Sequence, residues 1–535
     1  MIGGMMEYEL TLIHILERAG KLFPARRVTS REPDGSISHT TYASVYDRSR
    51  RLASALRQLG LADGQRMATL GWNHAQHLEA YFGVPVSGAV LHTINPRLHV
   101  DDIAYIFQTA EDRALLVDES LLPLLDQLPE EVRPSVVIAW APAGAELPDG
   151  VLNYETLLAE ADPSIPYPDI AENDAASMCF TSATTGRPKG VVYSHRALVL
   201  HSIVSAMTDE FGISGHDVVM PVVPMFHVNA WGLPYTAALV GAGLVLPGPQ
   251  LDGASLLELI ASEDVTFTAG VPTVWVRALE VLGDSSGAYD LSSLKTVLIG
   301  GAAASPALIE AVDALGPSVL HAWGMTETTP LGSVARLKPG LEVSEAERLS
   351  YRATQGLPAP LVDIRAEGKD GPVPWDNETM GELEARGPWV AGSYLAGAGE
   401  DRFTEDGWLR TGDIAVIGPE GYIKIVDRSK DLIKSGGEWI SSLDLENTLM
   451  EHPAVREAAV IAVPDEVWIE RPLAIVVPAS EISEEELLDF LRARFPKWQV
   501  PDGVVSVDEI PKTATGKVSK KDLRERFGAP RNSGE

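Results

Sequence analysis

Short, continuously apolar runs alternate with helical stretches through most of the 535-residue chain. The runs 114–118 (ALLVD) and 136–140 (VVIAW) are examples, and segments 75–81 and 120–128 have helical character. Such runs are typical of strands buried on both faces, and their alternation with helices indicates parallel α/β layers. Two further runs, 265–271 and 296–301, meet glycine at their carboxyl ends, where α/β sheets bind ligands.

The pattern changes after residue 360. Segments such as 381–386 alternate apolar and polar residues between turns, which favours antiparallel strands. Beyond the charged stretch 427–431 we expect a helix, two strands and a second helix, at 442–451, 455–463, 473–477 and 483–495. The predicted fold is α/β: a large N-terminal lobe (1–429) of layered α/β subdomains plus a β-rich subdomain, and a small α+β C-terminal domain (430–535).

Composition excludes several classes of function. The formal net charge of −32 disfavours binding to nucleic acid or to anionic lipid, which needs basic surface. The single cysteine, Cys179, excludes an intramolecular disulfide framework and a cysteine-rich zinc site, and its apolar surroundings indicate a small core residue.

The sequence also indicates a soluble, cytoplasmic protein. The N-terminus lacks the basic start and apolar core of a signal peptide. The uncharged stretch 218–251 is interrupted by four prolines, which leaves less than the ~20 apolar residues of a spanning helix, so we expect no transmembrane segment.

A loop rich in hydroxyl groups and glycine follows the predicted strand 177–180. The loop, 181–190 (TSATTGRPKG), offers hydroxyl groups, backbone N–H groups and the Lys189 ammonium, which together can surround a polyphosphate. It does not have the Walker pattern. A Ser/Thr/Gly surface turn is an equally acceptable interpretation of the composition.

The loop resembles the phosphate-loop signature of the adenylate-forming superfamily, which comprises acyl-CoA synthetases, peptide-synthetase adenylation domains and beetle luciferases. The chain departs from that signature at Ala183, where the family usually has glycine; if the position requires a positive φ, alanine costs about 1 kcal/mol. The resemblance implies that the ATP-binding residues of the loop are Thr181, Ser182, Thr184, Thr185, Gly186 and Lys189.

Two further motifs follow in the family's order. The segment 324–329 (GMTETT) resembles the motif that faces the nucleotide and magnesium, which implies Glu327 as a Mg²⁺ ligand helped by Thr184, and Thr326 as a phosphate donor. A carboxylate beside a triphosphate requires a cation between the two anions. Segments 300–303 and 321–324 resemble the adenine pocket, although core packing is the simpler interpretation of the tryptophan alone. The implied nucleotide-site residues are Gly301, Ala302, Ala303, His321, Ala322, Trp323, Gly324 and Met325.

The remaining motifs lie toward the C-terminus. Segment 411–413 (TGD) with Arg428 resembles the family's ribose clamp, in which Asp413 accepts the ribose hydroxyls. Segment 511–517 resembles the C-terminal lysine motif, which implies that Lys517 bridges the substrate carboxylate and the α-phosphate of ATP. By the same resemblance, Lys430 is the hinge about which the small domain moves.

Two stretches indicate which members of the superfamily are most similar. Segments 221–234 and 434–441 resemble those of bacterial medium- and long-chain fatty-acyl-CoA synthetases. The resemblance implies that Trp231 gates an apolar tunnel, that His227 flanks the acyl site and acts in catalysis, and that Gly301 and Gly324 also contact the acyl substrate. It assigns the approach of coenzyme A to Lys434, Gly436 and Trp439.

The implied activity is a two-step ligation. The resemblance implies that a carboxylic acid, a medium- or long-chain fatty acid, reacts with ATP and Mg²⁺ to give acyl-AMP, and that coenzyme A then displaces AMP. The alternative is an acyl- or aryl-adenylate-forming enzyme that passes the acyl group to an amine or a carrier protein. The resemblance suggests a homodimer, and no nucleic acid is expected as a partner.

Overall fold

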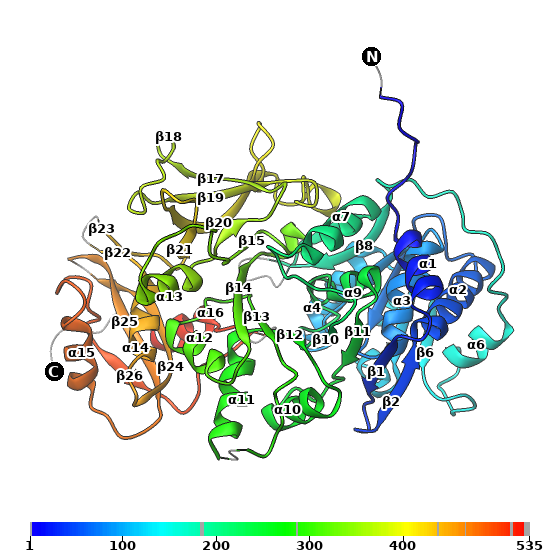
Figure 1. Cartoon of the computed structure of the whole chain (residues 1–535), viewed down its shortest axis with the longest axis horizontal. Helices are drawn as coiled ribbons and strands as arrows, with labels where there is room; N and C mark the ends of the chain where they lie inside the picture. The colour runs from blue at the N-terminus through cyan, green and yellow to red at the C-terminus, as the bar shows by residue number, and fades with distance from the viewer. Residues whose placement is uncertain are drawn as a thin grey trace.

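The computed structural model describes residues 3–181, 187–284, 287–435, 438–465, 467–513 and 517–528. Among these residues the strands form two large sheets that are mostly parallel, a five-stranded antiparallel sheet and a second five-stranded sheet near the C-terminus. Figure 1 shows the first three sheets together in one large body, with the C-terminal elements at its left. No helix in the described part of the chain is long and apolar enough to cross a membrane.

The first large sheet has seven strands in the order β7-β6-β5-β3-β4-β8-β9. Its pairs are parallel except that β9 runs antiparallel to β8. Its strands are β3 (Arg66–Leu70), β4 (Val90–Thr93), β5 (Ala114–Asp118), β6 (Val136–Trp140), β7 (Val151–Asn153), β8 (Ala175–Phe180) and β9 (Gly190–Ser194). The helices in this part of the chain are α1 (Leu12–Leu22), α2 (Tyr42–Gln58), α3 (Ala75–Val86), α4 (Val100–Ala110), α5 (Leu122–Leu125), α6 (Tyr154–Glu160) and α7 (His195–Ala206).

The second large sheet has nine strands in the order β16-β15-β14-β13-β12-β10-β11-β1-β2. It is parallel from β14 to β1 and antiparallel at both edges. Its strands are β1 (Arg27–Arg31), β2 (Ile37–Thr41), β10 (Val218–Pro221), β11 (Gly243–Leu246), β12 (Phe267–Gly270), β13 (Thr296–Ile299), β14 (Ser318–Trp323), β15 (Ser333–Val334) and β16 (Leu357–Pro358). The accompanying helices are α8 (Val228–Trp231), α9 (Leu233–Val240), α10 (Gly253–Ser262), α11 (Pro272–Asp284), α12 (Pro306–Asp313) and α13 (Glu345–Ala353).

The remaining strands are antiparallel but for the pairing of β26 with β25. The antiparallel sheet of the large body contains β17 (Asp363–Gly368), β18 (Gly371–Pro372), β19 (Gly381–Arg386), β20 (Leu409–Ile417) and β21 (Ile423–Arg428). The C-terminal lobe contains β22 (Ile433–Ser435), β23 (Glu438–Ile440), β24 (Val455–Asp465), β25 (Ile469–Pro478) and β26 (Val504–Ser506), with α14 (Ser442–Met450), α15 (Glu484–Arg492) and α16 (Lys520–Phe527).

Burial explains why these segments form these elements. All five residues of β5 are buried, as expected for a strand with parallel neighbours and covered faces, and the sequence prediction of a continuously apolar strand is confirmed. The first part of β20 alternates buried and half-buried residues, as predicted for an antiparallel sheet. Helix α15 begins with a capping box in which the Ser483 hydroxyl and the Glu486 carboxylate satisfy each other's backbone N–H groups.

Two predicted elements differ in extent. The helix expected at 120–128 is only the short α5 after a 3₁₀ turn, since Pro123 fits only the first turn of a helix. Strands β24 and β25 reach beyond the predicted 455–463 and 473–477, because ladder hydrogen bonds continue as far as the pair Asp465–Ile469. The boundary at 429/430 stays a prediction; β21 ends at Arg428 and β22 begins at Ile433, on either side of the predicted hinge.

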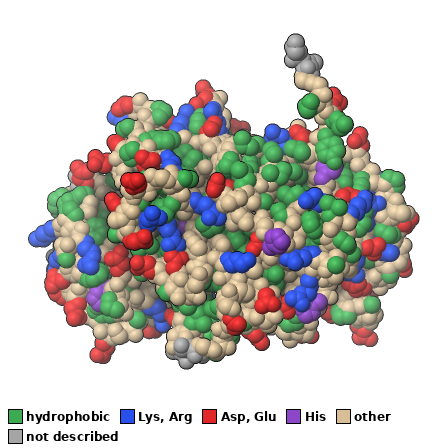
Figure 2. Space-filling model, viewed as in Figure 1, with side chains coloured by type: hydrophobic (Ala, Val, Ile, Leu, Met, Phe, Trp, Pro, Cys, Tyr) green, Lys and Arg blue, Asp and Glu red, His purple; other side chains and the backbone are tan. Residues whose placement is uncertain are grey.

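Acidic side chains are spread over the face drawn in Figure 2, with basic side chains lying among them. This distribution agrees with the net charge of −32.

Candidate functional site

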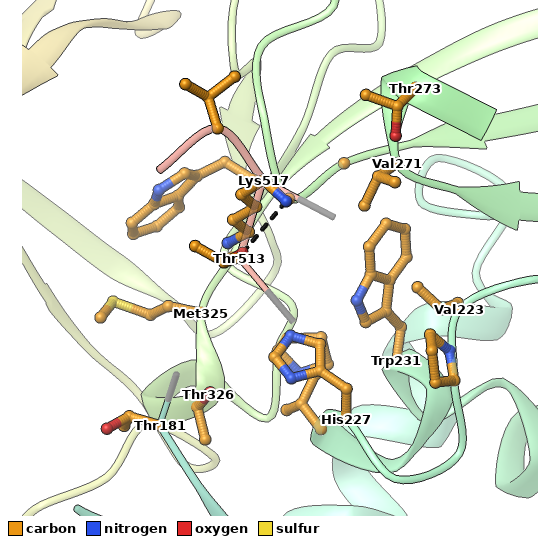
Figure 3. Close-up of a pocket in the computed structure, with 18 of the residues that line it drawn as sticks. Thr181, Val223, His227, Trp231, Val271, Thr273, Met325, Thr326, Thr513 and Lys517 are labelled. Carbon is orange, nitrogen blue, oxygen red and sulfur yellow. Dashed lines mark hydrogen bonds between the residues drawn. The ribbon is translucent and has the colours of Figure 1, made fainter. Parts of the chain in front are cut away.

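A cavity of about 470 Å³ lies at the carboxyl ends of β10, β12, β13 and β14, and the C-terminal lobe contributes to its wall. Figure 3 shows Thr513 and Lys517 from that lobe facing His227 and Trp231 from the large body. The cavity brings together most of the predicted site residues: Thr181, Lys189, His227, Trp231, Gly301, Ala322, Trp323, Gly324, Met325, Thr326, Glu327, Arg428, Lys430 and Lys517.

The base of the predicted phosphate loop is a hydrogen-bonded pair at the ends of β8 and β9. The Thr181 N–H donates to the Lys189 carbonyl (2.9 Å), and the Lys189 N–H donates to the Thr181 hydroxyl (3.1 Å). The Lys189 ammonium lies 5.2 Å from the centre of the Tyr394 ring. Four predicted loop residues lie outside the described residues: Ser182, Thr184, Thr185 and Gly186. Ala183, where the chain departs from the family signature, also lies outside them.

Glu327 is a buried carboxylate on the 3₁₀ turn Thr326–Thr328 that follows β14. It accepts a hydrogen bond from the Tyr394 hydroxyl (2.5 Å), and no lysine or arginine in the described part of the chain forms an ion pair with it. Burying a charge without a partner is costly, so a cation bound with the substrate would compensate it. The described residues contain no group of three or more potential metal ligands, which fits Mg²⁺ held by one carboxylate and substrate phosphates.

The predicted ribose clamp is assembled across the strands β20 and β21. The Nε of Arg428 lies 2.7 Å from one oxygen of the Asp413 carboxylate, and the indole N–H of Trp323 donates to the other (2.9 Å). This last contact was not foreseen from the sequence, because the two residues are 90 positions apart. Trp323 thus lines the cavity and orients the carboxylate, and it also packs against Gly332, where a Cβ would lie 2.4 Å from the indole.

Three residues predicted for the adenine pocket are not in the wall of the cavity. Ala302 and Ala303 lie in the turn after β13, and His321 is buried within β14. The His321 Nε2 accepts a hydrogen bond from the Ala304 N–H (3.4 Å), so the imidazole stabilises the turn without lining the cavity. Gly324 allows a close chain approach, since a Cβ there would lie 1.5 Å from the Pro330 carbonyl oxygen.

A left-handed turn positions the two predicted acyl-site residues. Residues 228–231 have φ values of 39°, 54°, 49° and 56°, a conformation that costs about 1–2 kcal/mol per non-glycine residue. The side chain of Asn229 anchors the turn by hydrogen bonds with the Ser177 hydroxyl (3.1 and 3.2 Å). Figure 3 shows that Trp231 consequently stands between Val223 and Val271.

Burial lowers the pKa values of Lys517 and His227, two of the basic groups in the cavity wall. Burial and, after it, the charge of Arg428 lower the pKa of Lys517 to about 8, although Asp413 and Glu327 oppose the change. Burial, followed by the charge of Lys517, lowers the pKa of His227 to about 3, so this imidazole is neutral at pH 7. Burial also raises the pKa of the Cys179 thiol to about 11, which agrees with the predicted core role.

The residues predicted to meet coenzyme A are elsewhere. Lys434 and Trp439 lie on the hairpin β22–β23 of the C-terminal lobe, with the ammonium 4.7 Å from the centre of the indole ring. Neither residue lines the cavity, and Gly436 lies outside the described residues. Lys430 does line it, and burial lowers the pKa of its ammonium.

Tyr394 and Arg402 were missed by the sequence reasoning although both line the cavity. The Tyr394 hydroxyl holds Glu327, and the Arg402 Nε donates to the Arg410 carbonyl (2.8 Å). Both residues come from the irregular segment between β19 and β20, which contains none of the motifs.

The chain is similar in sequence to known proteins over almost its whole length. A family model described as AMP-binding enzyme matches residues 16–395, and the model of the AMP-binding enzyme C-terminal domain matches residues 444–517. A long-chain-fatty-acid--CoA ligase of Thermus thermophilus is 51% identical, covering 98% of this chain and 96% of that protein. A medium-chain-fatty-acid--CoA ligase of Ectopseudomonas oleovorans is 44% identical, covering 99% and 98%.

The fold is also shared with a solved structure. The crystal structure of the anthranilate CoA ligase AuaEII in complex with anthranoyl-AMP has a TM-score of 0.87 and 26% sequence identity, covering 97% of this chain and 98% of that one.

Proposed function

The chain belongs to the family of AMP-binding enzymes, and from this premise we propose that it joins a medium- or long-chain fatty acid to coenzyme A with ATP. The observation that carries the proposal is the position of Lys517, which enters a cavity lined by apolar residues around Trp231 and by Glu327. The Asp413 carboxylate also acts on its ammonium.

The first step is adenylation. A fatty-acid carboxylate oxygen attacks the α-phosphorus of ATP, the bond to pyrophosphate breaks, and acyl-AMP forms. The Lys517 ammonium stabilises the negative charge that develops between carboxylate and phosphate. Asp413, held by Trp323 and Arg428, accepts the ribose hydroxyls. Glu327 would hold Mg²⁺ that is bound with ATP, and the cation would neutralise charge on the phosphates.

The second step is thioester formation. The C-terminal lobe turns about Lys430, which withdraws Lys517 from the cavity and brings the hairpin with Lys434, Gly436 and Trp439 toward the acyl carbonyl. This proposal is supported by the present position of the hairpin, because its exposed side chains lie outside the cavity while Lys517 occupies it. The thiol of coenzyme A then displaces AMP.

The acyl wall supports an apolar substrate. The residues around the left-handed turn offer apolar surface without a charge to pair with a polar acyl tail: Val222, Val223, Val228, Trp231, Val271 and Val274. The two fatty-acid--CoA ligases named above act on different chain lengths by name, so acids of several chain lengths belong in the test.

The proposal is tested by ATP–pyrophosphate exchange with a panel of straight-chain, aromatic and amino acids. Product formation is then measured with and without coenzyme A. We expect exchange to depend on medium or long alkyl chains and thioester to form with coenzyme A. Exchange with aromatic or amino acids only, or acyl transfer to an amine without coenzyme A, would contradict it.

A further inference from the structure

A small side chamber of about 60 Å³ adjoins the main cavity at the carboxyl ends of β4 and β8. The two cavities share Thr181, His227 and Thr513 in their walls, so the chamber lies beside the predicted phosphate loop and the acyl site. Most of its other wall is apolar, including Leu98 and Phe226. A chamber of this size holds a few heavy atoms and excludes a nucleotide or an alkyl chain.

His92 lies in the wall of this chamber and is fully buried. Its Nδ1 lies 2.9 Å from each carboxylate oxygen of Asp112, which follows α4 and whose side chain is also fully buried. The Nε2 of His92 has no hydrogen-bond partner among the described residues. Because an ionised carboxylate only accepts hydrogen bonds, Nδ1 carries the proton and Nε2 keeps its lone pair.

A second buried histidine shows what a purely structural role looks like. His77 is also fully buried, and both of its ring nitrogens have partners: the Thr69 hydroxyl at Nε2 (3.0 Å) and the Trp72 carbonyl at Nδ1 (2.9 Å). Buried polar atoms are nearly always satisfied. His201 Nε2 and His321 Nδ1 also lack a partner among the described residues, but neither residue lines a cavity, whereas His92 lies beside a chamber that a hydrogen-bond donor could enter. The carboxylate, the oriented imidazole and the free Nε2 have the arrangement of a general base.

We propose that His92, oriented by Asp112, is the general base that removes the proton from the pantetheine thiol in the second half-reaction. The proposal rests on the proposed function, since it needs an acyl-AMP intermediate and a thiol acceptor. A thiol fits the chamber in size and apolarity, and Thr513 of the C-terminal lobe forms part of the wall in the present arrangement. Withdrawal of Thr513 with the C-terminal lobe therefore opens the chamber when the thiol must enter.

In this step the thiol S–H bond breaks and its proton passes to His92 Nε2. The sulfur electron pair forms a bond to the acyl carbonyl carbon, and the bond from that carbon to the phosphate oxygen breaks, which releases AMP as an anion. Asp112 stabilises the resulting imidazolium until the proton leaves to solvent. The charged or titratable groups that face the pair are Arg66, which acts on the Asp112 carboxylate, and His227 across the chamber.

The test uses single-turnover thioester formation from supplied acyl-AMP and coenzyme A, measured from pH 6 to 9 alongside ATP–pyrophosphate exchange. For Asp112→Asn and His92→Gln we expect the thioester rate at pH 7 to fall about 100-fold while exchange is retained. The difference in thioester rate between the variants and the wild type should shrink as the pH rises to about 8.5, the pKa of a free thiol, because the thiolate then forms without a base. His77→Gln is the matched control, which should lower the melting temperature and affect both half-reactions equally.

Equal losses in the two half-reactions of Asp112→Asn and His92→Gln, or an unchanged thioester rate in either folded variant, would overturn the proposal. If neither variant folds, the pH dependence of the thioester rate of the wild-type enzyme tests the proposal. A thioester rate that is level between pH 7 and 8.5 supports a base, and a rate that climbs in proportion to thiol ionisation refutes one. Wild-type enzyme that shows no exchange with any acid would instead refute the proposed function.

Discussion

Lys517 and Lys520 are separated by two residues, and both side chains are partly buried, but their surroundings differ. Burial alone would lower the pKa of Lys520, yet Glu446, Asp427 and Asp431 outweigh it and raise the pKa, and the ammonium lies 2.7 Å from a Glu446 oxygen. Lys517 has no ion pair among the described residues, and burial lowers its pKa to about 8.

The difference separates a structural cation from one held for a substrate. The ion pair of Lys520 lies within the C-terminal lobe, because Glu446 lies on α14 and the lysine begins α16. Lys520 also lies in the cavity wall, but Glu446, with Asp427 of β21, already compensates its charge. The Lys517 side chain projects from the C-terminal lobe into the cavity, where the anion that would compensate its charge comes from the reactants. Uncompensated burial of a charge is costly, and such sites are often functional.

The largest effect is expected when the movement of Lys517 is prevented. Lys430→Pro fixes φ near −65° and restricts the preceding residue, so it should freeze the joint between the lobes. Measured separately, one half-reaction should fall by orders of magnitude and the other only modestly; we expect adenylation to survive. Overall thioester synthesis near the wild-type rate would show that Lys430 is not the hinge, and a thermal melt must exclude unfolding.

Replacing the structural lysine should act on stability. Lys520→Met leaves the buried Glu446 without its cation, and breaking a buried pair in this way costs about 3–5 kcal/mol. Urea denaturation should show that loss, while the two half-reactions of the folded enzyme change together. A selective loss of adenylation would remove the distinction between the two lysines.

The acyl wall should respond differently from either lysine. Trp231→Ala removes an indole between Val223 and Val271, so discrimination between acids that differ by a few methylenes should change about tenfold. The KM for ATP serves as the internal control. A collapse of ATP affinity with an unchanged acid profile would place Trp231 in the nucleotide site or in the core.

A smaller effect is expected from pH. Because the pKa of Lys517 is lowered to about 8, its ammonium is charged below that pH and neutral above it. The kcat/KM of adenylation should therefore fall as the pH rises through about 8, and Lys517→Arg, which stays charged, should remove the fall where it retains activity. A profile that is flat to pH 10 would mean that the charge of Lys517 is not needed.

Much of the fold could be predicted because local chemistry decides it. Continuous apolar runs such as β5 became buried strands, and the alternating segment 381–386 became β19 with the predicted bounds. The helix at 120–128 failed because the two prolines in and after it outweigh the apolar pattern.

The sequence predicted which residues form the site, but not the contacts between them. Motifs placed Glu327, Asp413 and Lys517 in one site, whereas the indole of Trp323 on Asp413 and the hydroxyl of Tyr394 on Glu327 depend on long-range folding. The left-handed turn 228–231 has no glycine inside it, and tertiary contacts such as Asn229 with Ser177 add to its local backbone hydrogen bonds. The chamber beside His92 likewise depends on the pairing of β4 with β8.

The most direct test of the distinction between the two lysines measures both half-reactions of Lys517→Ala in single turnovers. The account predicts that adenylation falls about 100- to 1000-fold, because a charge aimed at the transition state is lost, while thioester formation from supplied acyl-AMP is largely retained. Equal loss of the two half-reactions in a protein with a wild-type melt would contradict the claim that Lys517 serves the first step alone.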